Sequence, residues 1–185
     1  MTAERAILVR MTDLRYPTGK PAFNDHPTPD TRKALIRSIA AAPADLRTAV
    51  EGLDDAQLDT PYRPGGWSVR QVVHHVPDSH LNAYVRFKLA LTEDNPTIRT
   101  YDEAAWANVA DTHVTPVEVS LTLLEAVHRR WVILLGAMKD ADFTRPLQHP
   151  VNGPMTLDRL LQIYAWHGPH HVAHITALGR REGWS

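Results

Sequence analysis

Apolar residues recur every three to four positions in four long stretches of this chain, the spacing that places them along one side of an α-helix. No stretch shows the alternation of apolar and polar residues that is typical of a half-buried strand. Because loops rich in proline and glycine separate the stretches, the pattern predicts an all-α fold, a four-helix bundle with long loops. The expected helices span residues 30–53, 68–91, 115–139 and 156–182.

Residues that favour helix N-termini precede each stretch, because their side chains accept hydrogen bonds from the free amides of the first turn. Two prolines fall inside expected helices, and each removes one backbone donor. Pro43 therefore predicts a kink or break in the first helix, and Pro77 predicts a kink in the second. The expected caps are Asp30, Ser68 in a capping box with Gln71, Thr115 in a capping box with Glu118, and Thr156.

The segments outside the helices define the domain organisation. Prolines and glycines punctuate the start of the chain and predict an irregular N-terminal arm over residues 1–29. A single four-helix bundle domain is expected over residues 30–185. Two long connections are expected to be loops. The first spans residues 92–114 and contains a short helix at 102–110, and the second spans residues 140–155.

Composition narrows the class of protein. The formal net charge is -1 with acidic and basic residues intermixed, which argues against a nucleic-acid partner. The absence of cysteine excludes disulfides, thiolate metal ligands and cysteine nucleophiles. No apolar run approaches the roughly 18–20 residues of a membrane span, and the apolar stretch Ala6–Val9 is too short for a signal peptide. We therefore expect a cytoplasmic protein with no membrane partner. Met11 is a candidate alternative start, with which residues 1–10 would be a dispensable tail.

Histidines are concentrated in the last expected helix, which carries four of the eleven between His167 and His174. Imidazoles four positions apart project from the same side of a helix, and two of them can bind one metal ion. Helical periodicity places His171 near the middle of the apolar side and His167 on its flank. His174 lies further out in the same pattern, and His170 lies close to the exposed side.

Two simpler explanations compete with a metal site. Histidines near helix ends are often polar surface residues, and a single histidine on an apolar side is usually a hydrogen-bonded core residue. Two inward imidazoles one turn apart must each find a polar partner, because burying an unpaired polar group costs free energy. A shared cation satisfies both rings, so the pattern favours metal binding by His167 and His171.

A second pair, His74 and His75, could supply a third ligand from the second expected helix. Neither lies on the simple apolar side, and Pro77 disturbs the helical phase, so periodicity does not choose between them. Asp78 lies three positions after His75 and fits a carboxylate that accepts a hydrogen bond from a ligand histidine. It fits a solvated helix residue somewhat better.

These motifs resemble those of a known family. The second expected helix opens with Gly-Trp-Ser-Val-Arg-Gln-Val-Val-His-His at residues 66–75, and the last carries the pair His167 and His171. Both are similar to motifs of the DinB/YfiT-like superfamily of metal-binding four-helix proteins. The likeness to its YfiT branch, which is related to bacillithiol transferases, extends over most of the chain. Further segments that resemble this branch are Leu14–Pro17, Pro61–Arg63, Arg86–Glu93, Tyr101–Glu103 and Trp166–Gly168.

The resemblance implies which histidines are ligands. In the superfamily one ligand lies eight residues after the tryptophan that opens the helix, which selects His75 here. The other two form an i,i+4 pair whose second member precedes an isoleucine by four residues, which selects His167 and His171. The chain departs from the family pattern at Pro77, where alanine is more usual, and at His174, where glutamine is common.

The resemblance also implies a homodimeric cytoplasmic protein with one zinc or nickel ion per subunit, and a metal-dependent hydrolase of small-molecule substrates. Three neutral histidine ligands leave a coordination position open, where water can be activated for attack. One alternative is a thiol S-transferase, in which bacillithiol or another low-molecular-weight thiol takes that position as a thiolate. Another is a non-catalytic metal-binding stress protein. No general base is evident from the sequence, and Asp78 and His174 are the candidates.

Overall fold

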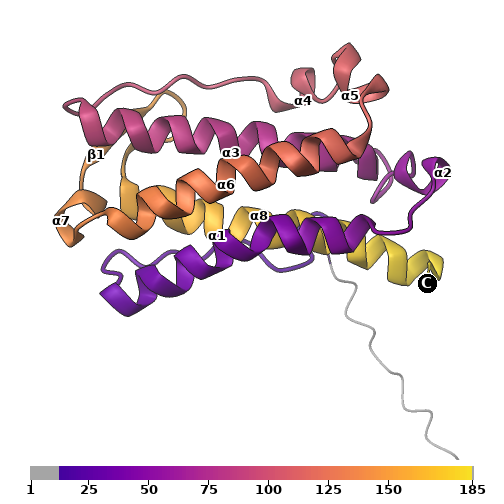
Figure 1. Ribbon diagram of the computed structural model, residues 1–185, viewed down its shortest axis with the longest axis horizontal. Coiled ribbons are helices and arrows are strands. Elements are labelled where there is room, and N and C mark those ends of the chain that lie inside the picture. The colour runs from indigo at the N-terminus through magenta and orange to yellow at the C-terminus, as the bar shows by residue number, and fades with distance from the viewer. Residues whose placement is uncertain (1–12, 185) are drawn as a thin grey trace, which may run out of the picture.

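Four long helices and several short elements make up the structure, a computed structural model that describes residues 13–184 (Figure 1). The expectations for the alternative start at Met11 and for the stretch Ala6–Val9 lie outside the described residues. In chain order the elements are α1 (Pro29–Val50), α2 (Asp55–Leu58), α3 (Val69–Thr92), α4 (Glu103–Trp106), α5 (Ala110–Val114), α6 (Val117–Ala137), α7 (Asp140–Phe143), β1 (Pro146–His149), β2 (Gly153–Thr156) and α8 (Leu157–Glu182).

The four long helices form two parallel pairs, which confirms the four-helix bundle and specifies its topology. In Figure 1, α1 and α8 run in one direction, and α3 and α6 run in the other. α1 packs against α8 and α6, and α3 packs against the same two helices. Because α3 and α6 are parallel, the chain between them must return along the length of the bundle. The long connection after α3, which carries α4 and α5, is that return.

Two of the predicted helix starts are confirmed in detail. The Ser68 side chain accepts a hydrogen bond from the Gln71 amide, and the Gln71 side chain accepts one from the Ser68 amide. Thr156 caps α8 by accepting from the amide of Arg159. These bonds satisfy amides that the first helical turn leaves free, so the sequence alone fixes where α3 and α8 begin.

The other two predicted caps are wrong. α1 begins two residues earlier than expected, because Thr28 accepts from the Thr31 amide and Pro29 takes the first helical position. Asp30 is therefore inside the first turn. Thr115 does not cap α6, since its own amide bonds to the carbonyl of Asp111 and ends α5.

Prolines lie inside three of the long helices without ending them: Pro43 in α1, Pro77 in α3 and Pro169 in α8. Proline has no amide hydrogen, so the carbonyl four residues earlier loses its helical partner. The carbonyl of Ile39, four residues before Pro43, accepts from Nδ1 of His128 in α6 instead. The carbonyl of Ala165, four before Pro169, accepts from the Ser38 hydroxyl. The expected break at Pro43 does not occur, because the neighbouring helix supplies the missing donor.

The two long connections contain more regular structure than the sequence predicted. α4 and α5 replace the single short helix expected at 102–110. The expectation of a loop over 140–155 is wrong, because this segment holds α7 and the antiparallel hairpin of β1 and β2. Strands of four residues are too short for an alternating pattern to be recognised.

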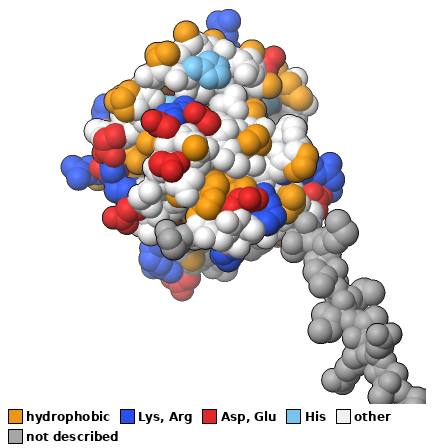
Figure 2. Space-filling view, turned by 90° about the vertical axis from the view of Figure 1, so that its right-hand side faces the viewer, with side chains coloured by type: hydrophobic (Ala, Val, Ile, Leu, Met, Phe, Trp, Pro, Cys, Tyr) orange, Lys and Arg blue, Asp and Glu red, His pale blue; other side chains and the backbone are white. Residues whose placement is uncertain are grey.

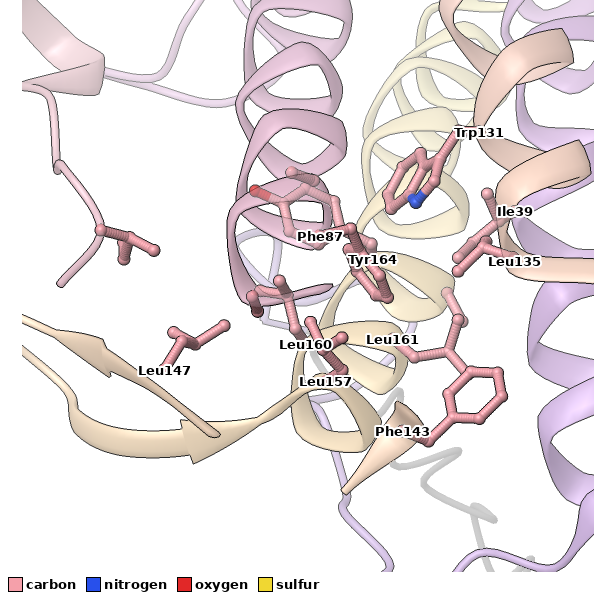
Figure 3. Close-up of a cluster of buried hydrophobic side chains, with 14 residues drawn as sticks. Ile39, Phe87, Trp131, Leu135, Phe143, Leu147, Leu157, Leu160, Leu161 and Tyr164 are labelled. Carbon is pink, nitrogen blue, oxygen red and sulfur yellow. The ribbon is translucent and has the colours of Figure 1, made fainter. Parts of the chain in front are cut away.

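Two apolar clusters fill the bundle, and histidines lie where they meet. The first contains Trp131 and Tyr164, whose ring centroids are 5.5 Å apart and which Figure 3 shows among leucines of α8. The second, toward the start of α3, contains Val72, Leu124 and Ile175. Each long helix except α1 contributes a buried histidine at the junction: His75 and His80 from α3, His128 from α6, and His171 from α8. His167 of α8 lies beside them and is partly buried.

The surface carries both signs of charge. Lysine and arginine side chains are interspersed with aspartate and glutamate on the face shown in Figure 2, as the net charge of -1 leads one to expect. Among residues 13–184, no helix combines the length and the apolar character that crossing a membrane requires.

Candidate metal centre

Three histidines from two helices converge between the apolar clusters. His75 projects from α3, and His167 and His171 project one turn apart from α8. The Nε2 atoms of His75 and His167 are 3.3 Å apart, and one ring nitrogen from each of the three lies within 4.8 Å of the other two. The structure therefore brings together the three residues that the sequence predicted as metal ligands.

A close contact between two helices positions the α8 pair. A Cβ atom at Gly168 would lie 2.8 Å from the Cβ of Ala42 in α1, nearer than side-chain carbons pack. Glycine at this position therefore lets α8 lie directly against α1. With α8 held at this distance from α1, His167 and His171 face His75 with ring centroids 5.3 Å and 4.9 Å away.

Burial keeps the three imidazoles neutral. Desolvation lowers the pKa of His75 to about 4. It also lowers the pKa of His167 and of His171 well below the ordinary value of 6.5, with neighbouring histidines adding to the effect. A neutral imidazole keeps a nitrogen lone pair free to bind a cation. All three side chains are therefore in the ligating form at neutral pH.

The donor set fits a divalent transition-metal ion. Zinc–nitrogen bonds of about 2.0–2.1 Å in tetrahedral geometry place two ligand nitrogens roughly 3.3–3.4 Å apart, and the Nε2 atoms of His75 and His167 are 3.3 Å apart. The buried Nδ1 atom of His171 has no hydrogen-bond partner among the described residues. Imidazole nitrogen suits zinc and nickel, so the residues match the ions implied by the family resemblance.

A cavity of about 510 Å³ opens onto the three histidines. Aromatic and imidazole rings make up much of its wall: Trp67 packs 4.7 Å from the His75 ring, and Tyr62 stacks 4.0 Å from the His174 ring. The arm before α1, the loop before α3 and one side of α8 all contribute. The lining residues are Arg15, Tyr16, Tyr62, Arg63, Gly65, Gly66, Trp67, His75, Glu103, Trp166, His167, His170, His171 and His174.

Two arginines and one carboxyl group bring charge to this cavity. Arg15 pairs with Asp13 at 2.8 Å, which balances its positive charge. Arg63 donates hydrogen bonds to oxygens of its two neighbours in the chain and forms no ion pair with a carboxylate of the described residues. Glu103 is the one carboxyl in the lining formed by residues 13–184, and partial desolvation raises its pKa above the ordinary value although the side chain is exposed to solvent.

The remaining predicted residues lie in different places. His74 points away from the cavity, because its Nδ1 atom is 2.7 Å from the Ser120 hydroxyl of α6. Asp78 does not line the cavity, although burial raises its pKa to about 6. His174 does line it, and its Nε2 atom is 3.2 Å from the carbonyl oxygen of Arg15. Of the two candidate bases, only His174 is therefore near the three histidines.

The prediction that His170 lies close to the exposed side is wrong. Its side chain is buried, with Trp166 stacked 4.1 Å away and Tyr16 at 6.0 Å. The arm before α1 covers this side of α8, and the periodicity of α8 alone carries no information about that contact. His170 therefore lines the cavity with the other three histidines of the cluster.

Three residues near the site were missed from the sequence. Glu103 follows directly after Tyr101 and Asp102 in a segment already identified by its resemblance, and nothing in its spacing singled it out. His80 and His128 could have been found from periodicity. His80 lies four residues after Val76, and His128 lies four after Leu124, so both occupy core positions of their helices.

Comparison with known proteins agrees with this geometry. Residues 38–175, which include the three histidines, match the model of the DinB superfamily. A Bacillus cereus protein named "Putative metal-dependent hydrolase" is 50% identical over 174 residues, which cover 94% of this chain and 100% of that protein. A Bacillus mycoides protein of the same description is 49% identical over the same coverage.

Solved structures show the same fold. YfiT from Bacillus subtilis, described as a probable metal-dependent hydrolase with an unusual four-helix bundle topology, superposes with a TM-score of 0.91. It is 47% identical, and the match covers 93% of this chain and 99% of YfiT. The four-helix bundle protein TT2238, at 20% identity and a TM-score of 0.55, shares the fold alone. The chain belongs to the DinB superfamily.

Proposed function

We propose that this protein is a metal-dependent hydrolase in which His75, His167 and His171 hold one zinc or nickel ion per subunit. The observation that carries the proposal is the convergence of three neutral imidazoles at one end of a cavity. The names of the similar Bacillus proteins support it. Three protein ligands are typical of catalytic zinc sites, since structural sites are closed by four.

The residues of the chain prepare this site for chemistry. A divalent ion bound here supplies Lewis acidity to water or to a substrate oxygen at the positions that three ligands leave open. Neutral histidines add no negative charge, so they leave that acidity undiminished. Trp67 and Tyr62 line the cavity with apolar surface and limit the water that reaches the histidines.

Glu103 is the group best suited to move a proton. Among the described residues it is the one carboxyl in the cavity lining, and partial desolvation raises its pKa above the ordinary value while the side chain keeps access to solvent. A carboxylate whose pKa is raised is a stronger base than one with the ordinary pKa, and it can return the proton to a leaving group. Arg63, which has no carboxylate partner among the described residues, favours substrates that carry a negative group.

A hydrolysis assay on protein purified without an affinity tag tests the proposal. The protein is stripped with a chelator, reloaded with zinc or nickel, and presented with a panel of activated esters and amides. We expect turnover only after reloading, and loss of turnover in His171→Ala. His74→Ala is the matched control, because it removes a buried histidine that bonds to Ser120 outside the cavity. Equal turnover by stripped and reloaded protein would exclude a metal-dependent hydrolase.

Each reaction is run with and without a low-molecular-weight thiol to identify the reaction class. Turnover without thiol supports hydrolysis. Turnover that strictly requires thiol rejects hydrolysis in favour of thiol S-transfer. If the reloaded protein shows no turnover with or without thiol, the protein binds metal without catalysis and the proposed hydrolase activity is rejected.

A further inference from the structure

Behind the three histidines, a chain of hydrogen bonds crosses the bundle through two imidazoles that have no place in the cavity. Nδ1 of His167 is 3.0 Å from Nε2 of His80. Nδ1 of His80 is 2.7 Å from Nε2 of His128. Nδ1 of His128 is 2.8 Å from the backbone carbonyl oxygen of Ile39. His80 and His128 are at most 2% exposed, so water does not compete for these bonds.

The Ile39 carbonyl at the far end sets the donor-to-acceptor direction of all three hydrogen bonds. A carbonyl oxygen only accepts, so Nδ1 of His128 must carry a hydrogen, and the Nε2 atom of the neutral ring is then an acceptor. The same reasoning places the hydrogen of His80 on Nδ1, donated to His128. Nε2 of His80 is then an acceptor, so His167 donates from Nδ1. His167 is left with a free lone pair on Nε2, the atom that faces His75.

A proline leaves the Ile39 carbonyl free to accept this hydrogen bond. The carbonyl of Ile39 would ordinarily accept from the amide four residues later in α1, and that position is Pro43, which has no amide hydrogen. His128 in α6 supplies the donor instead. The buried carbonyl and the buried ring therefore satisfy each other, which explains both a proline inside α1 and a histidine among core residues of α6.

We propose that His80 and His128, directed by the Ile39 carbonyl that Pro43 frees, are positioning residues that hold His167 in the tautomer with its hydrogen on Nδ1. This proposal rests on the proposed function, because it assigns a purpose to the Nε2 lone pair as a metal ligand. Among the three ligands, only His167 has a hydrogen-bond partner on its second ring nitrogen within residues 13–184. Partners of this kind orient a ligand ring and fix its protonated nitrogen.

The tautomer is measured directly in the wild-type protein after removal of metal. With ¹⁵N-labelled histidine, long-range ¹H–¹⁵N correlation spectra distinguish the protonated from the unprotonated ring nitrogen, and His80→Gln, His128→Gln and His167→Gln provide the assignments. We expect hydrogen on Nδ1 in His167, His80 and His128. Hydrogen on Nε2 of His167 in the metal-free protein would overturn the proposal. This measurement needs no bound metal, so it stands even if the hydrolase assignment fails.

Metal affinity tests whether these hydrogen bonds strengthen metal binding at the three histidines. His128→Leu removes both the acceptor for His80 and the donor to Ile39, whereas His128→Gln retains one acceptor and one donor. Zinc affinity, measured by competition with a chromophoric chelator, is expected to fall about 10- to 100-fold in His128→Leu and to recover in His128→Gln. The control is His74→Gln, which changes a buried histidine of α3 that takes no part in these hydrogen bonds. We expect wild-type zinc affinity in this variant.

The outcomes separate the two proposals. Wild-type zinc affinity in a folded His128→Leu protein, judged by far-UV circular dichroism, would reject the positioning role. Equal loss in His128→Gln and His128→Leu would also reject it, because donor and acceptor would then be irrelevant. Absence of zinc binding in the wild-type protein would reject the proposed function, while the spectra would still report the tautomer.

Discussion

Replacing Gly168 with alanine tests whether close contact between α1 and α8 positions the candidate site. The added Cβ would lie 2.8 Å from the Cβ of Ala42, whereas ordinary contacts begin at about 3.4 Å, so the helices must separate by roughly 0.6 Å. Alanine in place of glycine favours a helix by about 1 kcal/mol. Overpacking a filled interface costs about 1–3 kcal/mol. The interface cost should cancel or exceed the gain from helix propensity.

The matched control is Gly179→Ala in the same helix. Its nearest neighbour beyond the helix backbone is a Trp184 carbon at 3.7 Å, an ordinary contact, so it should gain helix propensity without a clash. We expect Gly168→Ala to be about 1–3 kcal/mol less stable than Gly179→Ala. At roughly 2–4 °C per kcal/mol for a protein of this size, thermal unfolding should separate the two by about 2–12 °C.

Thermal and urea unfolding of the metal-free proteins give this difference directly. Zinc affinity is measured alongside, because a displaced α8 changes the positions of His167 and His171 relative to His75. If Gly168→Ala is as stable as Gly179→Ala and binds zinc equally well, close packing at Gly168 does not determine the geometry of the site.

Three further predictions concern stability and chemistry. Arg32 and Asp158 form a largely buried ion pair with contacts of 2.7 and 2.8 Å, so Arg32→Met should destabilise the protein by about 3 kcal/mol in urea unfolding; a loss below about 1 kcal/mol would contradict this. Burial lowers the pKa of His128 from 6.5 to about 4, so below pH 6.5 the unfolded chain binds a proton that the folded chain does not. Stability of the metal-free protein should therefore fall between pH 6.5 and 4, by roughly 3 kcal/mol for this group, and a flat profile across that window would refute it. Glu103→Gln should lower hydrolysis about 100-fold or more without changing zinc affinity; unchanged turnover would remove Glu103 from the mechanism.

Local signals in the sequence predicted most of the bundle. The capping box of Ser68 and Gln71 fixes the start of α3 because all its atoms lie within one turn. The pair His167 and His171 follows from helical spacing for the same reason. His75 was chosen over His74 by family resemblance, since periodicity near Pro77 did not distinguish them. The structure places His75 against the α8 pair and His74 against α6.

Contacts between distant segments account for what the sequence did not predict. The burial of His170 depends on Tyr16, more than 150 positions away, in an arm without regular periodicity. The bond from His128 to the Ile39 carbonyl depends on the pairing of α6 with α1 at one particular height. The sequence predicts a kink or break at Pro43 because helical periodicity considers α1 alone. The donor that replaces its missing amide comes from another helix.

Zinc binding to tag-free protein tests the central claim most directly. The protein is stripped, titrated with zinc against a chromophoric competitor, and compared with His75→Ala, His171→Ala and the control His74→Ala. The proposed site predicts one ion per chain in the wild type and in His74→Ala, and loss of that ion in the other two variants. Full zinc binding by His75→Ala or His171→Ala would show that these histidines are not the metal centre.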